Sequence, residues 1–456
     1  MAVTASVMMQ MNDNARRTLV VGLGKTGLSV ARYLSRQGVE VAVVDSREQP
    51  PGLAELRDSL PADVALFLGG FDETAFARAG QLVVSPGVSV QEPPIAAAAA
   101  RGVPVLGDIE LFAREATAPV IAISGSNGKS TVTMLVSAMA QRAGREVRTG
   151  GNIGTPALDL LQDREPDLYV LELSSFQLET TQSLRAAAAV VLNISADHMD
   201  RYPHLDAYSR AKQTVYRGAG VQVVNRDDAL VSSLVDPQQP CITYTLQAPA
   251  EATEFGVLRH EGEAWLAQGE RAVMPVAAIR MPGRHNVGNA LAALALGSAA
   301  GLEQEAMVAT LAEFQGLPHR MQPVAERDGV HWYNDSKGTN VGATLAAISS
   351  VDGRVVLIAG GDAKGADLMP LRAAMQEHGR AAVLLGKDAG RLQQVLQGAV
   401  PLAMAADMAE AVRLARELAQ PGDNVLLSPA CASTDMFRNF EERGEVFSRA
   451  VGELLS

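Results

Sequence analysis

The feature that most constrains this chain is the segment 119–134, which reads PVIAISGSNGKSTVTM. Its apolar run at 120–123 suits a buried strand and is too short for a helix. A glycine loop, Lys129-Ser130-Thr131 and residues able to continue as a helix follow. Glycines let backbone N–H groups turn toward a phosphate, and the helix N-terminus adds positive charge. Although Ile123 stands where most such loops have a first glycine, the string favours a nucleoside triphosphate site over a plain strand-to-helix turn.

Polar residues follow two further apolar runs, which we expect to be strands. Glu172 comes directly after the run 168–171, and His198 lies in the polar stretch after 187–192. The carboxyl ends of parallel strands meet at one edge of a sheet. A carboxylate there, beside a phosphate loop with Ser130, is typical of a Mg²⁺ site. The glycine cluster 149–154 is either a further phosphate contact or a loop, and His198 alone would be typical of a loop histidine.

Two later helical patterns carry polar residues of uncertain use. From the residues alone, Lys212 lies in a predicted helix at 205–215 and is interpreted as a solvated helix lysine. Asn286 and Asn289 stand three apart at the start of an alanine- and leucine-rich helix, so they share a face. Asparagine at a helix start is usually a cap, but two on one face could hold a base or a ribose.

The N-terminal region contains a second glycine motif, which opens an alternative function. A predicted strand at 18–21 runs into GLGKTG at 22–27, and a second strand at 39–44 ends at Asp45. G-x-G-x-x-G after a strand, with an acidic residue about twenty positions on, fits the dinucleotide-binding fingerprint. An NAD(P)-dependent oxidoreductase is therefore a serious rival, although halves of this type bind many nucleotides.

Length and composition limit the remaining classes. A chain of 456 residues predicts about three domains, each with a core. A net charge of −12 argues against nucleic acid or an anionic membrane as partner, and no apolar run is long enough for membrane insertion. Cys241 and Cys431 have no metal-binding spacing, which suits a reduced cytoplasm. We expect a cytoplasmic monomer whose polar residues 1–17 are a disordered lead-in and not a signal peptide.

The C-terminal third again alternates predicted strands with helices. Its strands at 355–359, 382–385 and 424–427 predict a third doubly wound domain with its own ligand edge. The charged segment 316–320 is a candidate hinge, from which Arg320 could reach a nucleotide across a closing cleft. We therefore predict an α/β protein of three domains: an N-terminal Rossmann-like domain at 1–107, a central P-loop ATPase-type α/β domain at 108–316 and a C-terminal Rossmann-like domain at 317–456.

Taken together, these strings resemble the Mur ligase family of peptidoglycan synthesis. The resemblance covers essentially the whole chain after the lead-in. The phosphate loop and the pair His319-Arg320 are family-wide, whereas the N-terminal glycine loop with DSR at 45–47 and the closing segment 428–444 are similar to the member that adds D-glutamate. The strings that carry it are VVGLGKTG, SPG, GSNGKST, GGNIG, LELSSFQLE, NISADHMDRY, HNVGNALAALAL, HR, NDSKGTN, GGDAKGAD and SPACASTDMFRNFEERG.

The resemblance implies an ATP-dependent amide ligase. ATP would phosphorylate the L-alanyl carboxylate of UDP-N-acetylmuramoyl-L-alanine, and the amine of D-glutamate would attack the acyl phosphate and expel phosphate. Catalysis is then positioning and neutralisation of phosphate charge. In the family, two Mg²⁺ ions take part and the lysine matching Lys212 is carbamylated, which reverses the reading of Lys212 as a solvated lysine.

The resemblance also implies residue roles. The catalytic group would be Lys129, Glu172, His198 and Lys212, and the metal ligands Ser130, Glu172, His198 and Lys212. The nucleotide would contact Gly125, Asn127, Gly128, Lys129, Ser130, Thr131, Asn286, Asn289, Arg320 and Asp335. The UDP-sugar would contact Gly24, Lys25, Thr26, Asp45, Ser46, Arg47, Gly87, Asn152 and Ser174. D-Glutamate would contact His319, Lys337, Thr339, Lys364, Ser433, Thr434 and Phe440. A ligase of the same fold acting with L-glutamate or on a folate stays open.

Overall fold

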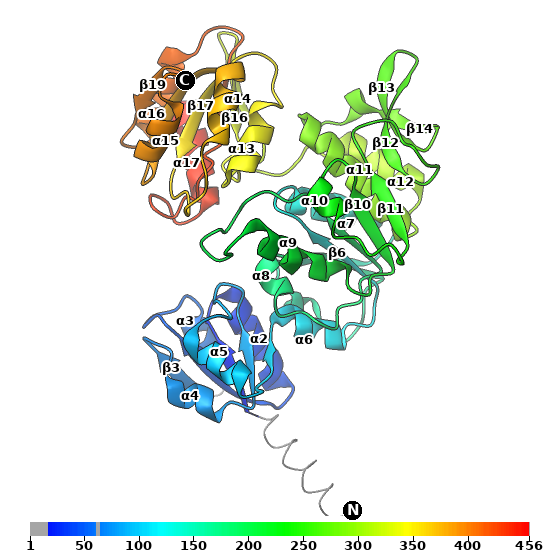
Figure 1. Cartoon of the computed structure of the whole chain (residues 1–456), viewed down its shortest axis with the longest axis vertical. Coiled ribbons are helices and arrows are strands. Elements are labelled where there is room, and N and C mark those ends of the chain that lie inside the picture. Colours follow the sequence, from blue (N-terminus) through cyan, green and yellow to red (C-terminus); the bar gives the residue numbers. More distant parts are fainter. Residues whose placement is uncertain (1–16, 61–63, 456) are drawn as a thin grey trace, which may run out of the picture.

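The computed structural model describes residues 17–60 and 64–455. It contains three sheets in chain order, each flanked by helices (Figure 1). The predicted α/β class with three domains is therefore confirmed. Of the predicted lead-in, residues 1–16 lie outside the described residues, while Arg17 is the first residue of a strand and so was wrongly included. Within the two described ranges, no helix combines the length and apolar character needed to cross a membrane.

The N-terminal sheet has five parallel strands in the order β3-β2-β1-β4-β5. This order matches the first five strands of the dinucleotide-binding order 3-2-1-4-5-6, in which ligands bind at the carboxyl ends of the strands. The predicted glycine loop follows β1 and leads into α2. The elements are β1 (Arg17–Val21), α2 (Lys25–Arg36), β2 (Glu40–Asp45), α3 (Leu53–Ser59), β3 (Ala65–Leu68), α4 (Glu73–Arg78), β4 (Gln81–Val84), α5 (Pro93–Ala100) and β5 (Val105–Leu106).

The central sheet has nine strands in the order β14-β13-β12-β11-β10-β9-β6-β8-β7. Its strands are parallel from β7 to β12, and β13 and β14 extend it as antiparallel hairpins. Strand β6, which carries the phosphate loop, lies inside the sheet between β8 and β9, so its residues are fully buried. The predicted helix at 205–215 is an α-helix to Gln213 that continues as a 3₁₀ turn.

The central domain begins with α6 (Asp108–Glu115), which packs on η1 (Ala157–Leu160) and α8 (Ser175–Leu178). Its elements are α6 (Asp108–Glu115), β6 (Val120–Ser124), α7 (Lys129–Arg142), β7 (Val147–Gly151), η1 (Ala157–Leu160), β8 (Leu168–Glu172), α8 (Ser175–Leu178), β9 (Ala188–Val191), α9 (Leu205–Gln213), η2 (Thr214–Tyr216), β10 (Val221–Asn225), α10 (Ala229–Ser232), β11 (Cys241–Tyr244), β12 (Phe255–His260), β13 (Glu263–Gln268), β14 (Arg271–Pro275), η3 (Val276–Ala278), α11 (Arg284–Ala299) and α12 (Gln304–Glu313).

The C-terminal sheet has six strands in the order β15-β16-β20-β17-β18-β19, and only β15 is antiparallel to its neighbour. The polar loops after β16, β17 and β20 therefore lie at one edge. The elements are β15 (Gln322–Arg327), β16 (Val330–Asn334), α13 (Val341–Ile348), β17 (Val355–Gly360), α14 (Pro370–His378), β18 (Gly379–Leu385), α15 (Ala389–Leu396), β19 (Leu402–Met404), α16 (Met408–Leu418), β20 (Asn424–Leu427) and α17 (Phe440–Leu455).

Candidate active site

The phosphate loop has the strand–loop–helix form that the sequence predicts. Gly128 has a φ of 84°, a left-handed conformation that glycine adopts without strain, and it turns the chain into α7 at Lys129. A side chain at Gly128 would also meet Asn289, because a Cβ there would lie 2.5 Å from Asn289 Oδ1. The loop and the helix α11 are therefore in close contact, and the N-terminus of α7, which begins at Lys129, is the kind of site that favours an anion.

Lys129 lies across the phosphate loop. Its Nζ donates hydrogen bonds to the carbonyl oxygens of Gly125, at 2.8 Å, and Ser126, at 3.0 Å. Burial lowers the pKa of Lys129, while the carboxylates of Glu172 and Asp197 oppose that effect. These carbonyl contacts can be exchanged for phosphate oxygens, which are stronger acceptors for an ammonium group.

Glu172 ends strand β8 beside the phosphate loop and has an unused oxygen. Its Oε1 accepts a hydrogen bond of 2.7 Å from Asn152 Nδ2, but its buried Oε2 has no hydrogen-bond partner. A buried carboxylate oxygen without a partner is costly unless a cation or donor completes it. Carboxylate and hydroxyl oxygens suit Mg²⁺, so Glu172 and Ser130 fit that ion. Within residues 17–60 and 64–455, no three His, Cys, Asp or Glu side chains gather as a metal cluster.

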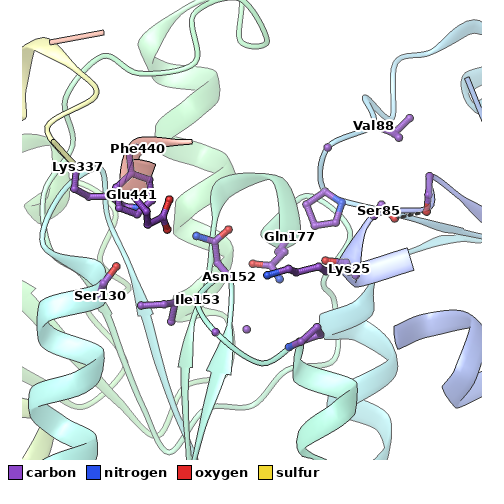
Figure 2. Close-up of a pocket in the computed structure, with 18 of the residues that line it drawn as sticks. Lys25, Ser85, Val88, Ser130, Asn152, Ile153, Gln177, Lys337, Phe440 and Glu441 are labelled. Carbon is purple, nitrogen blue, oxygen red and sulfur yellow. Dashed lines mark hydrogen bonds between the residues drawn. The ribbon is translucent and has the colours of Figure 1, made fainter. Parts of the chain in front are cut away.

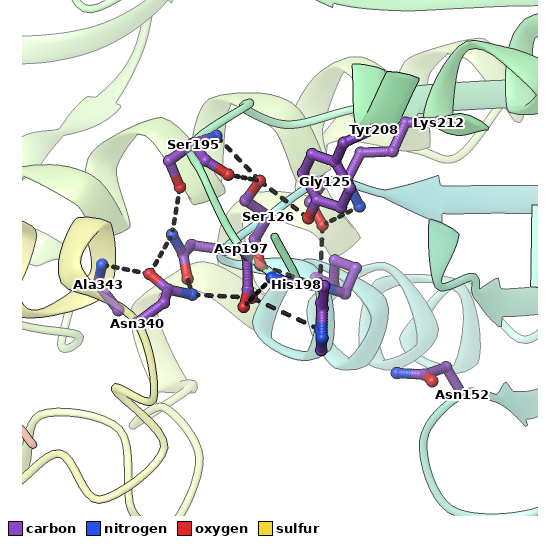
Figure 3. Close-up of polar contacts among 12 residues, drawn as sticks. Gly125, Ser126, Asn152, Ser195, Asp197, His198, Tyr208, Lys212, Asn340 and Ala343 are labelled. Carbon is purple, nitrogen blue, oxygen red and sulfur yellow. Dashed lines mark hydrogen bonds and ion pairs between the residues drawn. The ribbon is translucent and has the colours of Figure 1, made fainter. Parts of the chain in front are cut away.

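Lys212 is buried, contrary to the interpretation from the residues alone as a solvated helix lysine. Its exposed fraction is 1%, its Nζ donates to the carbonyl of Gly125 at 2.9 Å, and it lies 4.5 Å from the ring centre of Tyr208 (Figure 3). Burial lowers the pKa of Lys212 well below its usual value, and the nearby charge of Lys129 adds to this. The lowered pKa makes the uncharged amine easier to reach here than it is for an exposed lysine.

His198 lies in the loop after β9, where its φ of 55° is unusual for a residue with a side chain. Its ring packs on Phe176 at 4.8 Å between centres, and its Nε2 is 3.7 Å from Asp197 Oδ2. Burial lowers the pKa of His198, although Asp197 opposes the shift. A neutral imidazole can act as a metal ligand or a proton acceptor.

A cavity of about 310 Å³ adjoins the phosphate loop and is the candidate nucleotide site. Asn286 and Asn289 share the face of α11 that the sequence predicts, and Asn289 Nδ2 donates to Asn286 Oδ1 at 2.9 Å. The predicted nucleotide residues that line this cavity are Asn127, Gly128, Thr131, Asn286, Asn289, Arg320 and Asp335.

A second cavity, of about 910 Å³, is lined by all three domains (Figure 2). Lys25 lies at its N-terminal side and Lys337 and Phe440 at its C-terminal side, with Asn152 between them. The predicted substrate residues that line it are Gly24, Lys25, Thr26, Asp45, Ser46, Arg47, Gly87, Asn152, His319, Lys337 and Phe440, and Ser130 and Arg320 line it as well.

Asp45 is the acidic residue on which the dinucleotide alternative depends. Its Oδ1 accepts from the backbone and side chain of Arg47, and its Oδ2 accepts from Arg47 and from the Leu23 amide, at 2.7–2.9 Å. Burial acts to raise the pKa of Asp45, but these hydrogen bonds outweigh it and the pKa is lowered. Because both oxygens are engaged, Asp45 positions Arg47 at the cavity instead of presenting a free carboxylate to a ribose.

The C-terminal side of the large cavity carries buried charge. Lys337 Nζ lies 3.6 Å from the ring centre of Phe440, and burial lowers the pKa of Lys337 to about 8. Arg320 crosses to the central domain, where its Nη2 donates to Ser130 Oγ at 3.1 Å. Burial raises the pKa of Asp335 to about 6, although hydrogen bonds from Ser428 and Met321 favour its charged form.

Other predicted substrate residues lie outside the large cavity. Thr339 and Lys364 line a small separate cavity with Asp197 and His198. The Ser174 hydroxyl caps α8 by accepting from the Gln177 amide at 3.2 Å. Ser433 and Thr434 line neither of the two large cavities.

Sequence reasoning assigned no role to Asn340 or Arg443. Asn340 caps α13 and contacts the phosphate loop. An asparagine before a predicted helix is the sequence feature that could have indicated the cap.

Arg443 is buried on α17 and donates to the carbonyls of Ser336, at 2.8 Å, and Cys431, at 3.1 Å, so it joins two loops at the sheet edge. Burial lowers the pKa of Arg443 to about 10. Its Nε also donates to the Ser336 hydroxyl at 3.0 Å, but its other partners are backbone oxygens, which leave no signal in a sequence.

Fold and site together describe a three-domain α/β protein with a phosphate loop and a large cavity lined by all three domains. Three family models match in succession: the Mur ligase MurD-like N-terminal domain at 16–107, the Mur ligase middle domain at 123–297 and the Mur ligase glutamate ligase domain at 319–431. The chain belongs to the Mur ligase family. The resemblance inferred from the motifs is confirmed.

The relatives extend this match over nearly the whole chain. A Nitrosococcus oceani protein named UDP-N-acetylmuramoylalanine--D-glutamate ligase is 57% identical, with 97% of this chain and 98% of the relative covered. A Pseudomonas aeruginosa protein of the same name is 54% identical, with 96% and 98% covered.

Solved structures support the fold alone. A Methanothermus fervidus pseudomurein peptide ligase type C gives a TM-score of 0.59 at 17% identity, with 96% of this chain and 100% of that chain covered. Escherichia coli FolC in complex with DHPP and ADP gives 0.58 at 18% identity, with 77% and 94% covered.

Proposed function

We propose that this enzyme is an ATP-dependent ligase that joins D-glutamate to UDP-N-acetylmuramoyl-L-alanine in peptidoglycan precursor synthesis. The observation that carries the proposal is the position of the phosphate loop between the two cavities. Gly128 and Thr131 line the smaller cavity, while Ser130 lines the larger one. A nucleotide in the smaller cavity would thus present its terminal phosphate to a substrate in the larger one. The relatives named as D-glutamate ligases support the choice of substrates.

The first chemical step is activation of the L-alanyl carboxylate. A carboxylate oxygen attacks the γ-phosphorus, the bond from that phosphorus to the bridging oxygen breaks, and ADP leaves with the electron pair. Lys129, the N-terminal amides of α7 and Arg320 would hold the phosphate oxygens and neutralise their charge. Bound Mg²⁺ would supply further charge neutralisation. The residues proposed to hold it are Ser130 and Glu172 for one ion and His198 and Lys212 for a second.

The second step is attack by the acceptor amine. The nitrogen of D-glutamate adds to the acyl carbon, and the tetrahedral intermediate collapses with loss of phosphate and a proton from nitrogen. We place the acceptor on the C-terminal side of the large cavity, where Lys337 and His319 can face its carboxylates. Of the remaining predicted acceptor contacts, Phe440 lines the same side of this cavity, whereas Thr339, Lys364, Ser433 and Thr434 do not line it and stay predictions.

The substrate side is proposed for the N-terminal wall of the same cavity. Asp45 holds Arg47 at the cavity, and Lys25 projects into it (Figure 2). Cations and the start of α2 suit a diphosphate. The same glycine loop would therefore bind a uridine diphosphate group instead of NAD(P).

The proposed carbamylation of Lys212 has a direct test. In its uncharged form, which the lowered pKa favours, the Lys212 amine would attack CO₂, form an N–C bond and lose a proton, which gives an anionic oxygen ligand. Incubation with ¹³C-labelled bicarbonate should give a carbamate NMR signal in the native chain and none in Lys212→Ala. That variant should be inactive and partly rescued by short carboxylic acids. A native chain without the signal would contradict the modification.

The decisive experiment for the function measures phosphate release from ATP with UDP-N-acetylmuramoyl-L-alanine and D-glutamate, L-glutamate or neither. Release that requires D-glutamate is the expected result. Release only with L-glutamate would keep the mechanism and overturn the acceptor. Failure with every acceptor, together with nicotinamide reduction, would support the oxidoreductase instead.

The cell compartment and assembly state complete the proposal. Cys241 and Cys431 are both free thiols, which suits the reducing cytoplasm where ATP and nucleotide-activated sugars occur. We propose a cytoplasmic monomer, and sedimentation at working concentration should give the mass of one chain.

A further inference from the structure

Asn340, the residue before α13, contacts the phosphate loop from the C-terminal domain. Its Nδ2 donates to Asn127 Oδ1 at 3.1 Å, and Asn127 Nδ2 donates back to Asn340 Oδ1 at 3.4 Å (Figure 3). The two amides thus satisfy a donor and an acceptor on each other across 213 residues of chain.

The same side chain reaches a second loop of the central domain. Asn340 Nδ2 also donates to Asp197 Oδ2 at 3.2 Å. Asp197 Oδ2 lies 3.7 Å from His198 Nε2, and its Oδ1 accepts from the His198 amide at 2.9 Å. One amide from the C-terminal domain therefore touches both the phosphate loop and the carboxylate that faces the candidate metal ligand.

The central domain holds the backbone of Asn127 without help. Asn193 Oδ1 accepts from the Asn127 amide at 2.8 Å, and Asn193 Nδ2 donates to the Asn127 carbonyl at 3.0 Å. The central domain also accepts a hydrogen bond from Asn127 Nδ2 through Ser195 Oγ, at 3.3 Å, so it is Asn127 Oδ1 that takes its hydrogen bond from the C-terminal domain.

The first turn of α13 lies tightly against the same loops. A Cβ built on Gly342 would be 2.8 Å from Ser195 Oγ and 3.4 Å from Asn127 Nδ2. In the docked arrangement a side chain at this position would press on Ser195, whose side chain would have to shift. This close approach is a second observation, independent of the amide pair, that places α13 on the phosphate loop.

We propose that Asn340 is a positioning residue that couples docking of the C-terminal domain to the alignment of the phosphate loop and of Asp197. This inference rests on the proposed ligase function. When α13 docks, Asn340 fixes the Asn127 amide and directs Asp197 toward His198. When the domain is open, Asn127 keeps its hydrogen bond to Ser195 Oγ and Asp197 keeps its contacts with His198, but both lose Asn340 as a partner. Phosphoryl transfer is then favoured in the closed enzyme, which excludes water and holds the acceptor.

Two substitutions at Asn340 separate this role from helix capping. Asn340 Oδ1 also accepts from the Ala343 amide at 2.9 Å, and serine and aspartate cap helices about as well as asparagine. Asn340→Ser should lower kcat about tenfold through loss of the interdomain hydrogen bonds. Asn340→Asp should lower it further, because a second carboxylate would face Asp197. The KM for the UDP-substrate and the unfolding midpoint should not change.

Gly342→Ala provides a second route to the same test. Alanine favours a helix over glycine, so the C-terminal domain should be no less stable, yet the added methyl group would obstruct docking.

The matched control for the cap changes at Asn340 is Asp407→Asn. It changes the cap of α16 in the same domain, where Asp407 accepts from the Glu410 amide. That control should keep wild-type kcat.

Small-angle scattering with Mg²⁺, a non-hydrolysable ATP analogue and the UDP-substrate gives the readout that capping would not affect. The native chain and Asp407→Asn should contract, while the Asn340 and Gly342 variants should contract less. Unchanged kcat and contraction in Asn340→Ser would overturn the inference, and so would losses of activity that parallel a fall in unfolding midpoint. Failure of the ligase function itself would appear separately, as a native chain without D-glutamate-dependent phosphate release.

Discussion

The central domain meets its two neighbours through different kinds of contact. Toward the N-terminal domain, buried apolar side chains form one continuous cluster that includes Leu28 of α2, Phe112 of α6 and Leu158 of η1. Toward the C-terminal domain, hydrogen bonds link Arg320 to Ser130 and Asn340 to the phosphate loop. The C-terminal domain keeps its own apolar clusters on both faces of its sheet.

This difference indicates how the two sides can move. Separating an apolar interface exposes its whole area to water, whereas polar side chains that separate exchange their partners for water at little net cost. We therefore expect the N-terminal and central domains to act as one fixed platform for the UDP-substrate. The C-terminal domain can open and close on it, with the segment around Gly316, His319 and Met321, all at positive φ, as the hinge.

Lys129→Ala should have the largest effect and should leave the fixed platform intact. Loss of the ammonium group that holds the phosphates should lower kcat on the order of a thousandfold or more. Binding of the UDP-substrate, measured by calorimetry, should remain close to that of the native chain. Arg413→Ala, on the exposed side of α16, is the control. Near-normal turnover in Lys129→Ala would contradict the phosphate-loop assignment.

A matched pair of core substitutions tests whether two domains unfold as one unit. Phe112 packs edge-on against Tyr169 at 5.0 Å, and Phe447 packs against Trp332 at 6.3 Å between ring centres. Each phenylalanine is fully buried, so replacement by alanine should cost about 3–5 kcal/mol of unfolding free energy.

The two losses should fall on different calorimetric transitions. Phe112→Ala should lower the transition shared by the N-terminal and central domains, and Phe447→Ala only that of the C-terminal domain. If Phe112→Ala split the shared transition, leaving one of the two domains at its native midpoint, the fixed platform would be wrong.

The same contrast explains what the sequence could and could not predict. Strands such as β6 and β8 are short apolar runs followed by polar residues, so the α/β fold, the phosphate loop and the family were predictable and are confirmed. The burial of Lys212 was not, because it depends on where α9 packs relative to Gly125. The residue roles implied by the resemblance stay predictions, even where two cavities gather those residues.

Contacts between domains were the least predictable feature. Asn127 and Asn340 lie 213 residues apart, and neither local propensity nor periodicity carries information about such a pair. The apolar cluster shared by the N-terminal and central domains could not be predicted from the sequence for the same reason. An apolar residue in α2 has the same pattern whether it faces its own sheet or a neighbouring domain.

The pH dependence of acceptor binding tests the C-terminal domain, which we expect to open and close. Burial, with Arg320 nearby, lowers the pKa of Lys337 to about 8. Lys337 is charged below that pH and neutral above it, so the KM for D-glutamate should rise up to about tenfold per pH unit beyond pH 8. The KM for the UDP-substrate should not follow it. In Lys337→Arg, whose charge persists, the KM for D-glutamate should be flat with pH; an unchanged profile in that variant would exclude Lys337 as the cause.

The smallest expected effect concerns a polar contact within the fixed platform. Ser29 of α2 is buried and its Oγ donates to Asp159 Oδ1 of η1 at 2.7 Å. Ser29→Ala should lower the free energy of unfolding by about 1 kcal/mol, measured by urea denaturation, because Asp159 is half-buried and can still reach water. Its kcat should equal that of the native chain.

Asn340→Ser should show the reverse, with an unchanged free energy of unfolding and a lower kcat, because the interdomain hydrogen bonds of Asn340 form only on docking. If both variants lost unfolding free energy and neither lost kcat, the boundary between the N-terminal and central domains and the boundary between the central and C-terminal domains would behave alike. Polar contacts would then not be enough to make the C-terminal domain mobile.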